Sequence, residues 1–326
     1  MTDSVSHNKF LSEDIPKLFN LDHKPGQLFC SVHTNLGFCA SLNSSIHDIE
    51  VKHGLNNIMD GFIVDIDYQS KNGSCVGQFV DCMCRLVGSE LKHKPWNCSK
   101  DFKNYCRDQG SSYEMFLYKD ERFGCFPKAC AVCLFSRDLI KDFLSEHPNI
   151  TNRLACLVRD IHNLEYVALV MAVVAAFGIH LIETFHAVTI SKKSNHDSLT
   201  VFYRGLHEKM EQEITDEFIT LADAWYPGIS KNLFEEVKKS YGLHVVDEVR
   251  KELQKYPTEA LQIANHFQPN LQTTLARQRR DYGLDKSFVP EHPVEQLPQS
   301  VRENAPVHNL SMEGLCGKVG YRTAKN

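Results

Sequence analysis

Residues 167–179 read VALVMAVVAAFGI, a run of thirteen uncharged and mostly apolar residues. A membrane-spanning helix needs about 20 such residues, and polar side chains flank this run at Glu165 and His180. The run therefore predicts a buried core helix rather than a membrane segment. It belongs to a longer apolar pattern from Thr151 to Ile190, which predicts one bent helix or two, with Gly178 as the weakest point.

Helical spacing of apolar residues continues on both sides of this run. Upstream, apolar residues recur at helical spacing from Val76 to Val87, and Pro127 is well placed for a helix start. Downstream, the stretches Ser198–Trp225 and Ser230–Lys255 are amphipathic. We therefore expect a mostly helical chain from about Pro95 onward.

Two short strands are expected before that point. Gly26–Val32 follows a Pro-Gly turn, and Phe62–Tyr68 partly alternates apolar and acidic residues. From His33 the pattern turns helical. Residues 284–306 contain four prolines among polar residues, which predicts a connector with little regular structure of its own.

The composition is that of a soluble globular protein. Of 326 residues, 42% are hydrophobic and 24% are charged, which is enough to form a substantial core. The formal net charge of −5 creates no basic field, and this counts against a self-sufficient DNA-binding protein.

Twelve cysteines are many for a chain of this length. The opening residues Met1–Ser4 lack the basic and apolar regions of a signal peptide, so we expect an intracellular, reduced protein. Cys82 with Cys84, and Cys130 with Cys133, also suggest a metal or redox site. Both pairs lie in apolar helical patterns without the electropositive, partly exposed setting that activates a thiolate, which favours core packing.

Two carboxylates near the ends of the chain are candidate metal ligands. Asp3 lies in the motif TDSVSHN at 2–8, and Glu313 ends the motif NAPVHNLSME at 304–313. Hard oxygen ligands suit Mg²⁺ or Mn²⁺ in two-metal phosphoryl transfer. The plain alternative is that both carboxylates are ordinary surface charges.

Cys30 and His33 form a Cys-x-x-His pair at the expected strand-to-helix junction. Such a pair can place a sulfur and an imidazole on one zinc ion, although structural zinc takes four ligands and no second pair of suitable spacing follows. The alternative is that Cys30 packs in the core while His33 binds backbone. A third cluster, Arg277, Arg279 and Arg280, could contact phosphate or form a short basic turn on an exposed helix.

The order of these motifs resembles the later part of an RNase H-like, cut-and-paste DNA transposase of the hAT-like kind. In that family a second catalytic Asp lies in a Thr-Asp-x-x-x-x-Asn motif, a Cys-x-x-His follows the next strand, and a catalytic Glu follows a long helical insertion. Thr2-Asp3 with Asn8, Cys30 with His33, and Glu313 match these motifs in order. The segments Leu28–His33 and Lys94–Asn97 are also similar to uncharacterised transposon-derived proteins.

The resemblance implies an α/β remnant of an RNase H-like core that is mostly α overall. Residues 1–94 would be the partial core, 95–289 a helical insertion domain, and 290–326 a connector with the last core helix, which carries Glu313. It also implies that Asp3 and Glu313 bind Mg²⁺ or Mn²⁺, that the partner is transposon-end DNA, and that the location is nuclear. A homo-oligomer is left open, and no membrane is expected.

The sequence departs from this family in one decisive way. The family's first catalytic Asp precedes all of these motifs, and no position here matches it. Because a two-metal site with a missing ligand loses most of its activity, the resemblance implies a truncated or domesticated transposase-like protein that is inactive alone. The family also carries a Trp in its insertion near the DNA ends, a role that Trp225 could fill. The alternative is a non-enzymatic helical interaction protein, stabilised or not by zinc, which the acidic charge balance favours.

Overall fold

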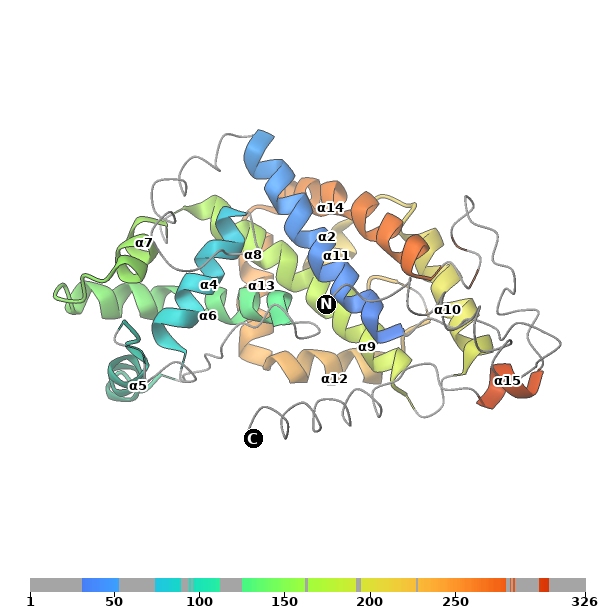
Figure 1. Cartoon of the computed structure of the whole chain (residues 1–326), viewed down its shortest axis with the longest axis horizontal. Coiled ribbons are helices and arrows are strands. Elements are labelled where there is room, and N and C mark those ends of the chain that lie inside the picture. The colour runs from blue at the N-terminus through green and yellow to red at the C-terminus, as the bar shows by residue number, and fades with distance from the viewer. Residues whose placement is uncertain are drawn as a thin grey trace, which may run out of the picture.

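The computed structural model describes residues 31–52, 74–88, 94, 96–111, 125–161, 164–191, 195–226, 228–279, 282, 284 and 299–304. Within these ranges the regular elements are helices that cross one another around a central helix (Figure 1). In chain order they are α2 (Ser31–Lys52), α4 (Cys75–Val87), α5 (Ser99–Asp108), α6 (Cys125–Glu146), α7 (Arg153–Ile161), α8 (Glu165–Phe177), η2 (Gly178–Glu183), α9 (Thr184–Thr189), α10 (His196–Lys209), α11 (Asp216–Thr220), α12 (Lys231–Tyr241), α13 (Leu243–Lys255), α14 (Pro257–Gln278) and α15 (Gln299–Asn304).

The prediction of a mostly helical chain is confirmed, since no strand occurs within the described ranges. The expected strand Gly26–Val32 is wrong at its end, because Ser31 and Val32 already belong to α2. The helix begins early because Phe38, Leu42 and Ile46, one turn apart, are all fully buried and need helical geometry to share one face. The rest of that strand, and all of Phe62–Tyr68, lie outside the described residues.

Two helix starts follow from local chemistry. The Ser74 side chain accepts a hydrogen bond from the Gly77 backbone N–H at 3.0 Å and so caps the first turn of α4. Pro127 is the third residue of α6. A proline is tolerated in the first turn because the N–H groups there have no partner within the helix. The helices predicted at Val76–Val87 and at Pro127 are therefore confirmed.

The central helix is the continuous stretch of α8, η2 and α9, which crosses the middle of Figure 1. Glu165–Thr189 is long and apolar enough by composition to span a membrane, but 94% of its most apolar window is buried against other helices. Burial on that scale is expected for a core helix whose apolar side chains lie all round it. The prediction of a buried core helix is confirmed.

Gly178 marks a change in the hydrogen bonding of that central helix. The α-helical pattern of α8 gives way at Gly178 to six residues of π-helix, which inserts extra backbone into the turn. A Cβ at Gly178 would lie 2.4 Å from Pro127 Cβ and 2.4 Å from Tyr241 Oη. Only glycine lets the start of α6 and the end of α12 approach the central helix so closely.

The most extensive packing between two described helices is that of α2 against α14, which run antiparallel. Gly37, Ser41 and Ser45 lie four residues apart on the face of α2 that meets α14. Ser41 Oγ lies 2.5 Å from Thr274 Oγ1, although the two residues are 233 positions apart. Further along, Asn270 Nδ2 donates to Ser45 Oγ at 2.8 Å. Small side chains on α2 therefore let the two backbones approach closely.

Replacing Gly37 with Ala should test this close approach. The added Cβ would lie 2.8 Å from Thr274 Cγ2, so α2 or the Thr274 side chain must shift. We expect the free energy of unfolding in urea to fall by about 1–2 kcal/mol. A Thr274→Ser change keeps the hydroxyl beside Ser41 but removes the methyl group, so the double variant should recover most of the loss. If Gly37→Ala alone were as stable as the wild type, α2 and α14 would not pack closely at Gly37 and Thr274.

The core continues across the expected domain boundary at residues 94 and 95. Asn97 Nδ2 donates to the Arg85 and Gly88 carbonyls at 2.7 and 2.8 Å, and the Cys98 N–H donates to the Leu86 carbonyl at 2.7 Å. Because α4 and α5 are joined in this way, and α2 packs along α14, the described parts of 1–94 and 95–289 share one hydrophobic core. Within 290–326, α15 contacts α10 through an ion pair between Arg302 and Asp197 at 2.5 Å.

Candidate functional site

Four of the predicted site residues lie outside the described residues: Asp3, Cys30, Arg280 and Glu313. His33 lies in the first turn of α2, at the position where the Cys-x-x-His motif enters the bundle. Ligation by these residues therefore stays a prediction. The described residues include the start of α2, directly after Cys30, and the end of α14, shortly before Arg280.

The antiparallel pairing of α2 and α14 brings those two points together. The Cβ position of Gly37, near the start of α2, lies 3.5 Å from Gln278 Cγ at the end of α14. In Figure 1 the beginning of α2 and the end of α14 accordingly lie at the same end of the pair. The start of α2 thus lies beside the end of α14, which is followed along the chain by Tyr282, Leu284 and α15.

The basic cluster near the end of α14 divides into one exposed and one buried arginine. Arg277 is exposed, whereas Arg279 is fully buried. The guanidinium carbon of Arg279 lies 5.0 Å from the Tyr203 ring centre and 4.7 Å from the Tyr282 ring centre. Aromatic faces attract a guanidinium at this distance. Arg279 therefore holds α10 and α14 together and does not present a phosphate-binding surface, contrary to the expectation for it.

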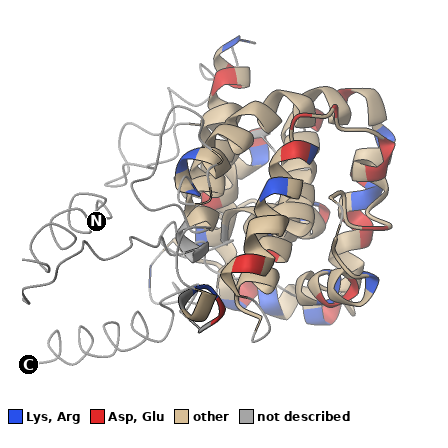
Figure 2. Cartoon of the chain, turned by 90° about the vertical axis from the view of Figure 1, so that its right-hand side faces the viewer, with Lys and Arg blue, Asp and Glu red and all other residues tan. Residues whose placement is uncertain are grey.

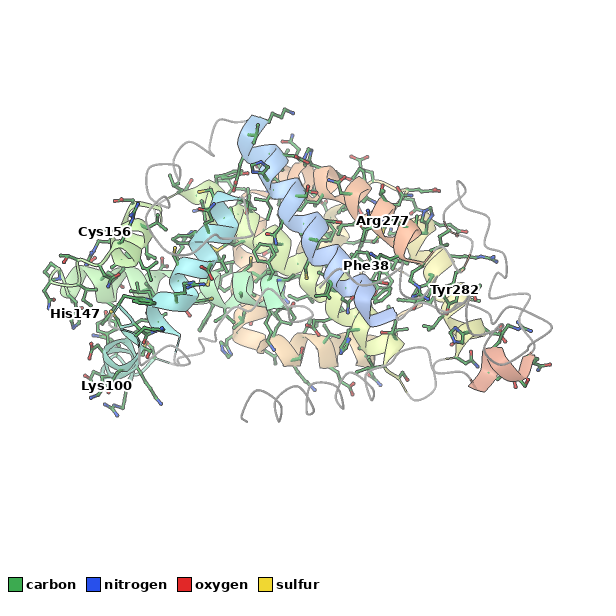
Figure 3. The ribbon with its side chains drawn as sticks, in the orientation of Figure 1. Phe38, Lys100, His147, Cys156, Arg277 and Tyr282 are labelled. Atoms are coloured by element: carbon green, nitrogen blue, oxygen red, sulfur yellow. The ribbon has the colours of Figure 1, made fainter. Side chains whose placement is uncertain are left out.

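Tyr282 extends the same cluster to the start of α10. Its hydroxyl lies 2.6 Å from His196 Nδ1, and its ring packs edge-on against Tyr203 at 4.8 Å. In Figure 3, Tyr282, Arg277 and Phe38 lie toward one end of the molecule, and Lys100, His147 and Cys156 toward the other. The end where α14 finishes is therefore built around aromatic rings and one internal cation.

Trp225 also lies inside the protein rather than on a DNA-facing surface. Its exposed fraction is 2%, and its ring packs edge-on against Phe177 and Phe218 at 6.3 and 6.0 Å. The backbone N–H of Trp225 donates to His180 Nδ1 at 3.2 Å. A stacking contact between Trp225 and a nucleotide base would require this core to open.

His180 is a buried hydrogen-bonding group of the central helix. Its Nε2 lies 2.9 Å from the Phe218 carbonyl, and its ring stacks on Phe234 at 5.3 Å. Since Nδ1 accepts from Trp225, Nε2 must carry the proton and donate to Phe218. Burial and the Lys238 ammonium, partly opposed by the hydrogen bond to the Phe218 carbonyl, lower the pKa of His180 to about 4. A neutral imidazole thus joins η2 to α11 and to the segment before α12.

The paired cysteines lie in the core, as their apolar setting predicts. Cys82, Cys84, Cys130 and Cys133 are all buried. Burial raises the pKa of Cys82 to about 12 and raises those of Cys130 and Cys133 well above the usual value for a thiol. Among the described residues no group of three or more His, Cys, Asp or Glu side chains is arranged to hold a metal ion.

A groove of about 560 Å³ lies at the opposite end of the α2–α14 pair. Its walls come from the end of α2 and the starts of α8 and α14, and it is lined by Ile49, Lys52, Glu165, Tyr166, Leu169, Tyr256, Glu259, Gln262, Ile263 and His266. At its rim, Lys255 Nζ donates to Glu165 at 3.1 Å, and the Tyr256 hydroxyl bonds the same carboxylate.

The Tyr166 hydroxyl in the groove wall is buried and has no hydrogen-bond partner among the described residues. Nothing in the periodicity of the sequence indicates this groove, because its walls come from three helices that are distant along the chain.

Glu50 is a second polar group that pattern analysis missed. It is fully buried at the end of α2, where its carboxylate accepts hydrogen bonds from the Cys75 and Val76 backbone N–H groups at 2.5 and 3.0 Å. Burial raises the pKa of Glu50, and the two N–H donors partly oppose that rise. An acceptor at a helix N-terminus satisfies otherwise unpaired donors, so Glu50 joins α2 to α4.

Charged side chains of both signs are interspersed over the described helices. Figure 2, which views the right-hand side of Figure 1, shows basic and acidic residues mixed along the helices in view. A general nucleic-acid surface gathers basic residues on one face. The described helices in this view therefore show no gathering of basic residues on one face.

No family model matches this chain, and no curated protein or solved structure is significantly similar to it.

Proposed function

We propose that this chain is a transposase-like protein derived from an RNase H-like DNA-strand-transferring enzyme, and that these 326 residues are inactive alone. The observation that carries the proposal is the antiparallel packing of α2 against α14. In a catalytic core interrupted by a helical insertion, a core segment before the insertion must lie close to the end of the insertion. The start of α2, which precedes the expected insertion of residues 95–289, and the end of α14, near the close of that insertion, meet this requirement.

The helical content of the described residues also supports the proposal. In this family the Cys-x-x-His motif precedes the helical insertion, and here His33 lies in the first turn of α2. The family then expects a long helical insertion, and the described parts of 96–279 are helices and their connections. In this proposal Cys30 and His33 steady the junction between the RNase H-like remnant and α2.

Asp3 and Glu313 would hold the divalent ion, which supplies charge neutralisation at phosphate when bound. Carboxylate oxygens are suitable ligands for Mg²⁺ or Mn²⁺. With the first catalytic Asp of the family unmatched, we expect the chain to retain at most weak ion binding and no strand cleavage. Transposon-end DNA and a nuclear location belong to the same proposal, as does assembly with further copies of the chain.

Mn²⁺ titration of the purified chain by calorimetry tests whether the two carboxylates converge. Asp3→Asn and Glu313→Gln should each weaken binding at least tenfold. The double variant should bind Mn²⁺ only slightly more weakly than either single variant, because both carboxylates bind the same ion. Asp160→Asn is the matched control, since Asp160 is an exposed carboxylate on α7 and should leave binding unchanged.

Additive small losses from the two changes, or none, would contradict a shared site. The proposal would also fail if Asp160→Asn weakened binding as much as Asp3→Asn. Metal analysis of the same preparations addresses zinc separately. Stoichiometric zinc that disappears in Cys30→Ser would support a zinc-stabilised fold around Cys30 and His33.

The alternative is a non-enzymatic helical interaction protein, and the groove between the ends of α2, α8 and α14 favours it. A half-open groove with apolar walls and a few polar groups is a common form of binding site. This alternative expects Asp3 and Glu313 to act as separate surface charges. The Mn²⁺ titration therefore discriminates the two functions.

A further inference from the structure

Two buried thiols from different helices meet in the core. Cys84 lies on α4 and Cys133 on α6, both fully buried, with 3.7 Å between the two Sγ atoms. Cys133 Sγ also lies 3.8 Å from the Val80 carbonyl, one turn before Cys84 on α4. The two sulfurs are therefore in direct contact, and their positions are held by the packing of α4 against α6.

We propose that Cys84 and Cys133 are a redox pair that forms an internal disulfide between α4 and α6 when the chain meets a peroxide oxidant. The sulfurs must close from 3.7 Å to the roughly 2 Å of an S–S bond. This inference is independent of the proposed function, since it uses neither Asp3 nor Glu313.

The reaction balances with hydrogen peroxide as the oxidant. One thiol is oxidised by peroxide to a sulfenic acid and releases one water molecule. The second thiol attacks that sulfur, the S–S bond forms, the S–O bond breaks, and a second water molecule leaves with the thiol proton. Two thiols thus lose two electrons and two protons in total, and one peroxide becomes two waters.

Burial sets the conditions under which this pair reacts. The thiolate is the reactive form, and burial raises the pKa of Cys133 well above the usual value for a thiol. Oxidation should therefore be slow in the native protein. Once formed, the bond closes the chain between residues 84 and 133, which includes α5, and limits the freedom of the unfolded chain. The oxidised protein should therefore unfold several degrees higher than the reduced one.

Peptide mapping of the full chain after peroxide treatment tests the proposal. The reduced protein is treated with hydrogen peroxide under native conditions, its free thiols are alkylated, and its peptides are analysed by mass spectrometry without reduction. We expect a linked pair of peptides containing Cys84 and Cys133, lighter by two hydrogens than their sum. We also expect a rise in Tm of several degrees that a thiol reductant reverses.

Cys84→Ala should abolish both the linked peptides and the rise in Tm. Cys156→Ala is the control, because the half-buried Cys156 on α7 has its Sγ near the Thr151 carbonyl rather than another thiol. Should Cys84→Ala fail to fold, the presence or absence of linked Cys84 and Cys133 peptides from the wild-type chain still tests the proposal. Alkylation of both Cys84 and Cys133 after prolonged peroxide treatment would overturn the proposal, as would a bond from either residue to Cys130.

Discussion

Replacing Gly178 with Ala should destabilise the protein by about 3 kcal/mol. The new methyl group would lie 2.4 Å from Pro127 Cβ and 2.4 Å from Tyr241 Oη. The proline ring is rigid and the tyrosine side chain is buried, so the central helix must move away from α6 and α12 together. The gain in helix propensity from Gly to Ala, about 1 kcal/mol, offsets only part of this cost. Urea unfolding followed by circular dichroism measures the change.

Gly205→Ala is the matched control for this prediction. Gly205 also lies within a helix, α10, but a Cβ there would meet no atom within 4 Å. That change should therefore stabilise the protein by about 0.5–1 kcal/mol. The double variant Gly178→Ala with Tyr241→Phe should recover only part of the loss, because Pro127 remains. Equal effects at Gly178 and Gly205 would show that the central helix is not tightly packed at its π-helical turn.

Lowering the pH from 7 to about 4 should remove about 3 kcal/mol of stability through His180 alone. The folded protein holds the pKa of His180 at about 4, mainly because of burial, whereas the ordinary value is 6.5. Between these two values the unfolded chain binds a proton that the folded protein excludes. The neutral His180 therefore makes its full contribution to the free energy of unfolding above pH 6.5, and this contribution falls as the pH drops toward 4.

A His180→Gln variant isolates this contribution from those of other titrating groups. A glutamine amide can donate to the Phe218 carbonyl and accept from the Trp225 N–H, but it does not titrate in this range. The variant should be less stable than the wild type at pH 7, because it loses the stack on Phe234. The difference between the two proteins should then shrink by about 3 kcal/mol as the pH falls to 4. Parallel pH profiles would mean that His180 is not buried as a neutral imidazole.

Local sequence pattern predicted those elements whose residues are close in the chain. The run at 167–179 has too few polar residues to form a surface helix, so its burial followed from composition. Gly178 was the expected weak point because glycine has poor helix propensity, and the helical hydrogen bonding does change there. The Val76–Val87 helix followed from its apolar spacing. Chain composition also indicated that the paired cysteines belong to the core.

Pairings between distant segments could not be predicted in the same way. Arg279 belongs to a basic cluster that a sequence pattern assigns to the surface, yet Tyr203 and Tyr282 bring its guanidinium into the core. Trp225 is buried because its ring packs against Phe177, 48 positions away, and Phe218, and its backbone N–H also donates to His180. The contact between Cys84 and Cys133 likewise depends on how α4 lies across α6.

Local periodicity and composition were enough to predict a mostly helical chain, the burial of residues 167–179, and Gly178 as the weak point of the central helix. They were enough because apolar period and backbone propensity act over a few turns. The antiparallel packing of α2 against α14, which brings the start of α2 beside the end of α14, follows only from the tertiary structure. An apolar face shows that a helix must pack against something, but it does not show which helix it packs against. That choice depends on complementary shape. Here the small residues Gly37, Ser41 and Ser45 of α2 fit against Thr274 and Asn270 of α14.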